Sequence, residues 1–261
     1  MSHEPQSAKD LNRAQFGANA SNYATSPVHA KGASLARMVE LVEPQPTWHA
    51  LDIATAAGHT AFAFAPHVSM MVASDLTPEM VELCAERAVE LGHENVRTEL
   101  ADAEALPFDD ASFDLATCRI APHHFPSPAT FVSEVARVLL SGGTFAMVDN
   151  IVPNNKDVAD TYNDWERRRD PSHLRCLSMD EWTKLCADQG LDVGHVETAP
   201  KRMGFTFWVE NMNVPVDERP GLLSDLLDAT VDVRKFLRPT GSTQDDAEFF
   251  LTEGLIVATK P

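Results

Sequence analysis

Apolar positions follow two different spacings along this chain. Short, mostly apolar runs predict buried strands at residues 48–54, 69–74, 113–118 and 144–148, and residues 95–100 are expected to form a further strand. Longer segments, with apolar residues three or four positions apart, predict helices at residues 33–42, 77–91 and 127–139. Because strands and helices alternate, the pattern predicts an α/β fold built on a doubly wound parallel sheet.

The pattern changes after residue 150. Further helices are expected at residues 157–169 and 178–190, and further strands at residues 191–198 and 249–259. The excursion between these two strands contains an aromatic cluster and a helical stretch at residues 222–237. Long insertions at the rim of a site tend to carry specificity, so we expect residues 199–247 to cap a binding site.

Composition excludes several classes of partner. The formal net charge of −18 argues against a nucleic acid or an anionic membrane surface as a partner. No run is long and apolar enough for stable insertion into a membrane. The four cysteines lie far apart and form no Cys-x-x-Cys pair, which argues against a zinc or redox motif. With a polar N-terminus that has no apolar signal region, we expect a cytoplasmic protein and leave its oligomeric state open.

Polar side chains follow five of the predicted strands. They are Asp52, Asp75, Asp102, Arg119 and Asp149. In doubly wound sheets, ligands bind beyond the carboxyl ends of the strands. Each residue alone suits a cap or a turn, but four carboxylates and one arginine at one rim indicate a binding site.

The first of these strand ends predicts a nucleotide-like ligand. Residues 50–60 form a strand, a turn of small residues that ends at Gly58, and the start of a helix, which brings backbone amides close to a ligand. Asp75 follows Asp52 by 23 positions, about the distance at which nucleotide-binding folds place a carboxylate on a ribose. Asp102 is suited to receive an adenine amine and Met80 to pack on the adenine ring.

The missing glycines narrow the choice of ligand. A dinucleotide site needs Gly-x-Gly-x-x-Gly, but alanines stand at positions 54, 56 and 57. Few basic residues line the rim, so the site would bind phosphate groups weakly. Its carboxylates suit a ligand that carries an ammonium and a sulfonium. A NAD-dependent oxidoreductase is therefore disfavoured. A non-catalytic module that binds a protein through residues 199–247 stays an alternative, because Ala56 stands in the ligand loop.

Several stretches resemble one family. They are residues 51–60, 74–80, 101–108, 113–125 and 135–143. Together they make the chain resemble the Rossmann-like, seven-stranded S-adenosyl-L-methionine-dependent methyltransferases of type 11, similar to the ubiquinone/menaquinone biosynthesis C-methyltransferases. The family usually has more glycine in the first loop, and Ala56 is the main departure from its pattern.

The resemblance implies an architecture and a cofactor site. The sheet order would be 3-2-1-4-5-7-6 with strand seven antiparallel. Residues 1–47 would form a helical lid, 48–198 plus 248–261 the cofactor-binding core, and 199–247 a cap. The implied cofactor-binding residues are Tyr23, Asp52, Ala54, Gly58, Asp75, Leu76, Met80, Asp102, Ala103 and Arg119. Of these, Asp52 and the turn would hold the methionine end, Asp75 the ribose, and Asp102, Ala103 and Met80 the adenine.

A methyl group on a sulfonium is electrophilic, so its transfer needs mainly proximity, orientation and removal of a proton from the methyl acceptor. Histidine suits the role of the base near neutral pH. We expect His123 or His124 to be the base, with His29 and His173 as further candidates. Arg119 either orients an acidic methyl acceptor or pairs with Asp149.

A magnesium-dependent variant is disfavoured, and no metal is expected. Asp149-Asn150 resembles the pair that binds magnesium in catechol-type methyltransferases, but that site also needs an aspartate where this chain has Arg119. The substrate-binding residues expected are Asp149, Asn150, His173, Phe205 and Trp208, with Phe207 as a further pocket wall. The methyl acceptor is expected to be a small, partly apolar molecule, methylated on carbon or oxygen.

Overall fold

The computed structural model describes residues 7–18 and 32–261. The strands are β1 (His49–Ile53), β2 (Met70–Asp75), β3 (Val96–Leu100), β4 (Phe113–Arg119), β5 (Leu139–Asn150), β6 (Asp192–Gly204) and β7 (Glu248–Thr259). The α-helices are α1 (Ala8–Ala18), α4 (Ala33–Val42), α5 (His59–Phe64), α6 (Pro78–Glu90), α7 (Pro128–Val138), α8 (Lys156–Arg169), α9 (Met179–Asp188), α10 (Phe205–Glu210), α11 (Arg219–Leu227) and α12 (Val231–Leu237). Two short 3-10 turns, η1 (Ala65–His67) and η2 (Pro122–His124), complete the description.

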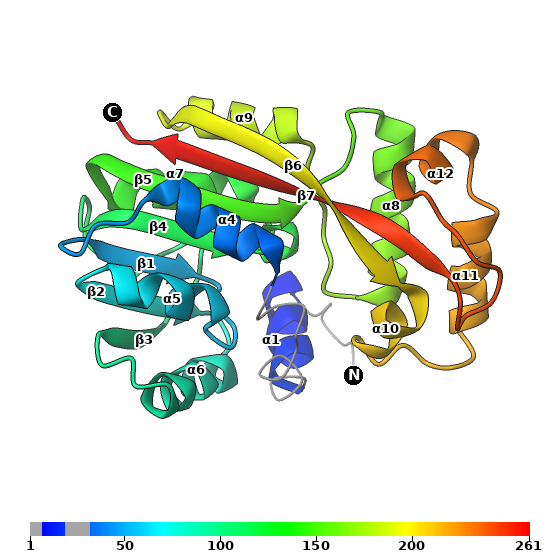
Figure 1. Cartoon of the computed structure of the whole chain (residues 1–261), viewed down its shortest axis with the longest axis horizontal. Coiled ribbons are helices and arrows are strands. Elements are labelled where there is room, and N and C mark those ends of the chain that lie inside the picture. The colour runs from blue at the N-terminus through cyan, green and yellow to red at the C-terminus, as the bar shows by residue number, and fades with distance from the viewer. Residues whose placement is uncertain (1–6, 19–31) are drawn as a thin grey trace, which may run out of the picture.

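The seven strands form one sheet in the order β3-β2-β1-β4-β5-β7-β6 (Figure 1). Strands β1 to β5 pair in parallel, whereas β7 is antiparallel to both β5 and β6. The predicted fold class, strand order and orientation of β7 are therefore confirmed. The carboxyl ends of β1, β2, β4 and β5 meet at one edge, as a parallel arrangement requires.

Helices cover both faces of the sheet because the central strands are apolar on both sides. Side chains alternate along a strand, so Leu51 and Ile53 face the cluster that α7 and α9 cover, while Ala50 faces the cluster of α4, α5 and α6. Asp52 shares the parity of Ala50 and therefore points toward the α5 side. Figure 1 shows α4 and α5 in front of the sheet.

Strands β6 and β7 extend beyond the rest of the sheet as a two-stranded ribbon. Their pairing continues to Gly204 and Glu248, whereas β5 ends opposite Glu253. Helices α8, α10, α11 and α12 pack around this ribbon and form a second hydrophobic cluster, at the right of Figure 1. Trp165 and Trp208 stack at its centre with ring centroids 4.0 Å apart. The sheet edge and this ribbon are therefore two surfaces built from different elements.

Three element bounds differ from the sequence prediction. Strand β6 runs on to Gly204 rather than ending near residue 198, because β7 offers a paired partner along its whole length. The helix expected at residues 222–237 is two helices, and Thr230 begins the second by accepting a hydrogen bond from the backbone of Val233. Strand β5 begins at Leu139, directly after α7.

None of the helices in residues 7–18 and 32–261 combines the length and apolarity that a membrane crossing requires.

Candidate active site

A first cleft lies beyond the carboxyl ends of the central strands and encloses about 640 Å³ of empty volume. The sheet edge contributes five of the predicted cofactor-binding residues to its lining: Ala54, Asp75, Leu76, Asp102 and Ala103. Helix α1 contributes Lys9 and Asn12 from the other side.

Asp52 supports the loop that follows β1 and does not line the first cleft. Its side chain is buried, and its carboxylate accepts hydrogen bonds from Thr55 Oγ1 at 2.6 Å, Thr117 Oγ1 at 2.7 Å and the Ala61 amide at 3.2 Å. Burial raises the pKa of Asp52 to about 6, although these hydrogen bonds oppose that change. Asp52 thus joins the loop, helix α5 and strand β4 into one unit.

The same loop has an unusual backbone. Ala54 and Ala56 adopt φ of 55° and 47°, in the left-handed region that side chains other than glycine disfavour. Gly58 has φ of 84°, and a Cβ there would lie 2.4 Å from the Phe62 ring, so no other residue fits without rearrangement. This conformation turns the Ala56 amide toward Asp75 Oδ2, 2.9 Å away. The loop amides are thereby fixed at the cleft.

Asp75 and Asp102 present carboxylates to the first cleft. Asp75 accepts hydrogen bonds from the amides of Ala56 and Thr77 at 2.9 Å each, and burial raises its pKa against the effect of these amides. Each carboxylate oxygen can accept a second hydrogen bond, so both retain capacity for a ligand hydroxyl. Asp102 Oδ2 accepts from Lys9 Nζ at 2.6 Å, and Lys9 also contacts Glu104 at 2.7 Å. Helix α1 is therefore tied to the cleft by an ion pair.

A second cleft of about 680 Å³ adjoins the first. Ile120 and His124 line both clefts, so these two residues mark where the clefts meet. Asn150 and Trp208, two of the residues predicted to bind the substrate, also line the second cleft. Ile120 has φ of 54°, an outlier for a β-branched residue, and its amide donates to Val148 O at 2.7 Å. Strain of this kind concentrates at functional sites.

His123 forms a buried pair with Asp149. The two atoms in contact, Nδ1 of His123 and Oδ1 of Asp149, lie 2.6 Å apart. Burial works to lower the pKa of His123, but the charge and the hydrogen bond of Asp149 outweigh it, and the net effect raises this pKa. Because the carboxylate holds Nδ1–H, the other ring nitrogen is the one available to a ligand, and His123 lines the second cleft.

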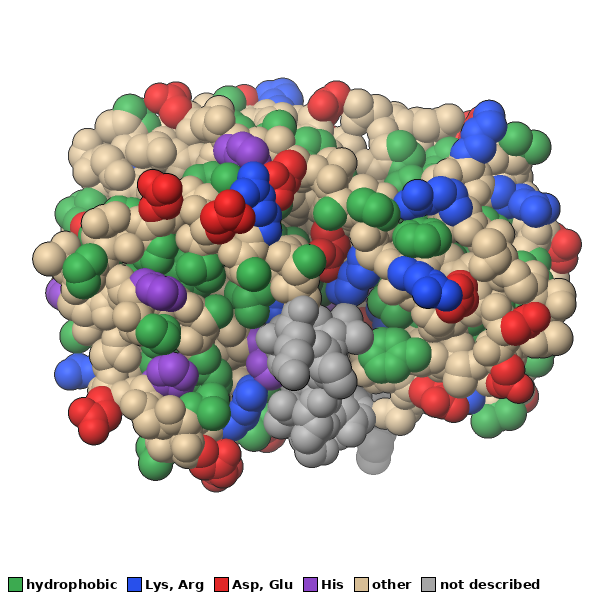
Figure 2. Space-filling view, in the orientation of Figure 1, with side chains coloured by type: hydrophobic (Ala, Val, Ile, Leu, Met, Phe, Trp, Pro, Cys, Tyr) green, Lys and Arg blue, Asp and Glu red, His purple; other side chains and the backbone are tan. Residues whose placement is uncertain are grey.

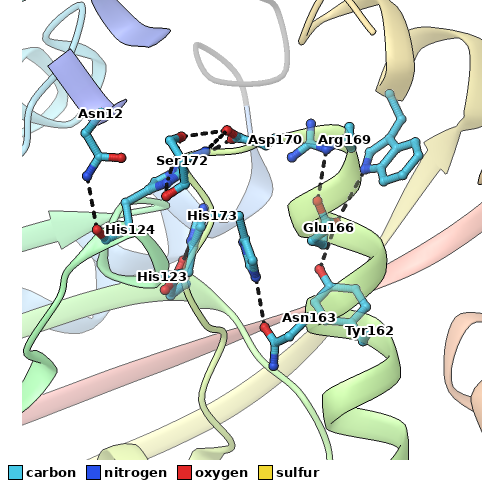
Figure 3. Close-up of polar contacts among 12 residues, drawn as sticks. Asn12, His123, His124, Tyr162, Asn163, Glu166, Arg169, Asp170, Ser172 and His173 are labelled. Carbon is cyan, nitrogen blue, oxygen red and sulfur yellow. Dashed lines mark hydrogen bonds and ion pairs between the residues drawn. The ribbon is translucent and has the colours of Figure 1, made fainter. Parts of the chain in front are cut away.

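The two other histidines of this cluster, His124 and His173, lie beside His123 (Figure 3). His124 Nδ1 lies 3.0 Å from Ser172 O, and His173 Nε2 lies 2.8 Å from Asn163 Oδ1. Burial is the largest cause that lowers the pKa of both, and the neighbouring positive charge of His123 lowers it further. Of the three imidazoles, His123 is the one whose surroundings favour the proton.

Other predicted residues lie away from both clefts. Met80 and Phe205 are fully buried in the core, and Gly58 is buried beneath the loop. Arg119 is half-buried and donates from Nε to Thr60 Oγ1 at 3.1 Å, and desolvation lowers its pKa against the charges of Glu253 and Asp52. His173 and Asp149 stand behind the lining as partners of other side chains. Tyr23 and His29 lie outside the described residues.

The structure adds residues that the sequence pattern did not indicate. Lys9 and Asn12 reach the first cleft from α1, and Arg169 and Lys201 reach the second from α8 and β6. Arg169 belongs to a basic run at the end of a polar helix, where its neighbours Arg167 and Arg168 face solvent. Nothing in its local spacing separates it from them, and Lys201 has no local signal at all.

Comparison with known proteins identifies the family. A profile described as a methyltransferase domain matches residues 51–147. The uncharacterized methyltransferase YcgJ of Bacillus subtilis is 37% identical over 223 residues, which cover 85% of this chain and 88% of that protein. Its crystal structure superposes with a TM-score of 0.84 at 36% identity, covering 87% of this chain and 97% of that one.

Two further proteins are similar. A crystal structure from Bacillus halodurans has a TM-score of 0.85 at 34% identity and covers 88% of this chain and all of its own. The ubiquinone/menaquinone biosynthesis C-methyltransferase UbiE of Zymomonas mobilis is 34% identical over 107 residues, which cover 41% of this chain and 44% of that protein. The chain therefore belongs to the S-adenosylmethionine-dependent methyltransferases with a Rossmann-like seven-stranded sheet.

Proposed function

We propose that this protein transfers a methyl group from S-adenosylmethionine to a carbon or an oxygen of a small, partly apolar acceptor. The observation that carries the proposal is that the two clefts lie side by side and share Ile120 and His124 in their linings. A cofactor in the one cleft and a methyl acceptor in the other would meet at these residues. Proximity of this kind supplies much of the catalysis of a direct transfer.

The lining of the first cleft fits the adenosine part of the cofactor. Adenosine offers hydrogen-bond donors, two ribose hydroxyls and an exocyclic amine, and the cleft offers oxygen acceptors in Asp75 and Asp102. Asn12 adds a third, because its Oδ1 is buried with no hydrogen-bond partner while its Nδ2 donates to His124 O at 3.0 Å. Ala103 and Leu76 provide an apolar surface beside these oxygens.

Each residue then has a defined task. Asp75 binds the ribose hydroxyls, Asp102 and Ala103 the adenine, and the loop of Ala54 the methionine end, with Asp52 holding that loop from below. When bound, the cofactor supplies a methyl group made electrophilic by a sulfonium. The residues of the chain orient the two reactants and exclude water, which are the main requirements of such a transfer.

The proton of the methyl acceptor goes to His123. Asp149 holds the Nδ1–H of this imidazole at 2.6 Å, which leaves Nε2 as the base. The resulting imidazolium is stabilised by the carboxylate beside it. His124, kept neutral by burial, serves as a hydrogen-bonding wall between the clefts. No metal takes part in this proposal.

Titration calorimetry with S-adenosylhomocysteine tests the cofactor site. We expect micromolar binding to the wild-type protein, a loss of about tenfold or more in Asp75→Asn, because a charged hydrogen bond to the ribose is removed, and no change in the exposed control Asp192→Asn. Absence of binding to the wild-type protein would overturn the proposal.

A second measurement separates an enzyme from the non-catalytic alternative. We expect wild-type protein to release S-adenosylhomocysteine from S-adenosylmethionine in the presence of a panel of small phenols and 1,3-dicarbonyl compounds, and His123→Gln to lose this activity. Cofactor binding with no turnover on any compound would favour a module whose partner binds the β6–β7 ribbon.

A further inference from the structure

The second cleft carries basic side chains in an otherwise acidic protein. Lys201 on β6 and Arg169 at the end of α8 line it, together with His123. Asp170 is the only acidic residue in this lining among the described parts of the chain. The whole sequence has a net charge of −18, so this local excess of positive charge is not what composition predicts. Figure 2 shows Lys and Arg side chains gathered over the half of the molecule that holds the ribbon.

The strand register places Lys201 on the cleft side of the sheet. Asn150 pairs with Glu253, and Glu253 pairs with Ala199, so these three side chains share one face. Lys201 lies two residues after Ala199 and therefore points to the same face. Its Nζ donates to Glu253 Oε1 at 2.9 Å, its only hydrogen-bond partner in the described residues. An ammonium has three donors, so Lys201 keeps two for a ligand in the cleft.

Arg169 is held in place by a buried network (Figure 3). Its Nε donates to Glu166 Oε2 at 2.9 Å, and its guanidinium lies over the Trp208 ring, 5.1 Å from the centroid. Glu166 is in turn fixed by Tyr162, whose hydroxyl donates to it at 3.1 Å, and by Trp208, whose Nε1 donates at 3.3 Å. The position of the guanidinium at the cleft is thus determined by the fold.

The acidic partners of the two cations lie outside the lining of the cleft, and Asp170, within the lining, is already engaged. Glu253 and Glu166 do not line the cleft. Asp170 Oδ1 accepts hydrogen bonds from the amide and the hydroxyl of Ser172, at 2.9 and 2.5 Å. A ligand in the cleft therefore meets positive groups first. Because each cation is partly neutralised by its carboxylate partner, the site suits one negative charge rather than a dianion or a diphosphate.

Resting on the proposed function, we propose that the methyl acceptor is a small organic molecule with one carboxylate, which binds to Lys201 and Arg169. The apolar side chains of Met203, Met212 and Leu251 line the same cleft and contact the body of this molecule. Asn150 Oδ1, buried with no partner, accepts a hydrogen bond from its hydroxyl or enol group. The atom that is methylated points to the junction at Ile120 and His124.

Binding of a matched acid and amide tests the charge preference directly. The probes are benzoate, benzamide and phenyl phosphate, titrated by calorimetry into protein saturated with S-adenosylhomocysteine. We expect benzoate to bind about tenfold or more tighter than benzamide, the effect of a charged hydrogen bond, and at least as tightly as phenyl phosphate. Equal binding of acid and amide, tighter binding of the phosphate, or no binding of benzoate at millimolar concentration would each overturn the proposal.

Substitution of Lys201 assigns the effect to this residue. We expect Lys201→Met to lose most of the preference for benzoate, Lys201→Arg to keep it, and the exposed control Lys184→Met on α9 to leave it unchanged. If Lys201→Met fails to fold because Glu253 loses its cation, the double variant Lys201→Met, Glu253→Gln gives the same comparison without a buried lone charge. If folded Lys201→Met still preferred benzoate to benzamide as strongly as the wild type does, Lys201 would not be the residue that recognises the carboxylate.

The outcomes separate this inference from the proposed function. Failure of S-adenosylhomocysteine to bind the wild-type protein would overturn the methyl-transfer proposal itself. Normal binding of S-adenosylhomocysteine together with no preference for the carboxylate would overturn only the anionic acceptor.

Discussion

Nδ1 of His123 and Oδ1 of Asp149 lie 2.6 Å apart although they come from the ends of different strands. His123 stands on the η2 turn after β4, and Asp149 near the end of β5, the neighbouring parallel strand. Asp149 Oδ1 also accepts the Asn150 amide at 2.9 Å, and its Oδ2 is buried without a partner. The sheet therefore presents one oriented imidazole to the second cleft.

Asp149→Asn should lower the pKa of His123. In the wild-type protein burial alone would lower this pKa, and the charge of Asp149 raises it instead, so removing the charge leaves burial to dominate. A base must be neutral, so the acidic limb of the rate profile should move to lower pH. The rate itself should fall by about a hundredfold or more, because Nδ1–H loses the carboxylate that orients it.

An NMR titration of the His123 ring proton measures this change without a methyl acceptor. Asp188→Asn, an exposed substitution on α9, serves as the control and should leave the titration where it is. A His123 pKa that stays unchanged in Asp149→Asn would remove the pair from the mechanism.

Ala56→Gly should stabilise the protein by about 0.5–1 kcal/mol, because glycine relieves the left-handed strain at some cost in unfolded-state entropy. The wild-type residue has φ of 47°. Ala85→Gly, in the middle of α6, is the matched control and should destabilise by about 1 kcal/mol. Chemical denaturation followed by circular dichroism gives both values, and equal destabilisation by the two glycines would show that the loop is not strained.

The sheet edge of the first cleft was predictable from sequence for a local reason. Asp75 ends an apolar run, Asp102 follows the strand predicted at residues 95–100, and strand ends in a parallel sheet must meet at one edge. Asp52 sits at such an end too, but its side chain turns under the loop, which depends on the distant Thr117. Whether a side chain at a strand end faces the cleft or the interior depends on tertiary packing. Sequence spacing alone therefore does not tell a residue that contacts the ligand from one that supports the loop.

The second cleft was less predictable because its walls come from distant segments. Trp208 belonged to an aromatic cluster visible in the sequence, and Phe205 belongs to the same cluster but is buried in the core. Lys201 reaches the cleft only because β6 extends beyond the other strands and pairs with β7. A single lysine in an unexpected continuation of a strand has no local pattern that would identify it.

Glu166→Gln should destabilise the protein by about 3 kcal/mol, since the Arg169 side chain, which is 15% exposed, loses the charge of a buried carboxylate. Glu166 is 2% exposed and pairs with Arg169 at 2.9 Å. Glu210→Gln is the matched control, because Glu210 pairs with Arg219 at 3.4 Å while its side chain is 58% exposed. That change should cost less than about 0.5 kcal/mol. Similar costs for the two variants in urea denaturation would show that the Glu166 network adds little stability.

His173→Gln should change how stability depends on pH. Burial is the largest cause that lowers the pKa of His173 in the folded protein, and the positive charge of His123 lowers it further. Below about pH 6.5 the unfolded chain takes up a proton at this histidine and the folded chain does not, so the wild type loses about 1.4 kcal/mol per pH unit from this group. Glutamine does not titrate, so the stability gap between wild type and variant should narrow at that rate as the pH falls from 6.5 to 5.

Asn163→Ala is the matched control for this prediction. It removes the 2.8 Å hydrogen bond to His173 Nε2 but keeps the buried imidazole, so its stability gap to the wild type should stay nearly constant over the same pH range. Urea denaturation at steps of half a pH unit gives the free energy of unfolding against pH for the wild type, His173→Gln and Asn163→Ala. A gap that stays constant for His173→Gln as well would mean that the imidazole is protonated in the folded protein. The cluster would then hold a second positive charge beside His123, and the neutral role assigned to its neighbours would be wrong.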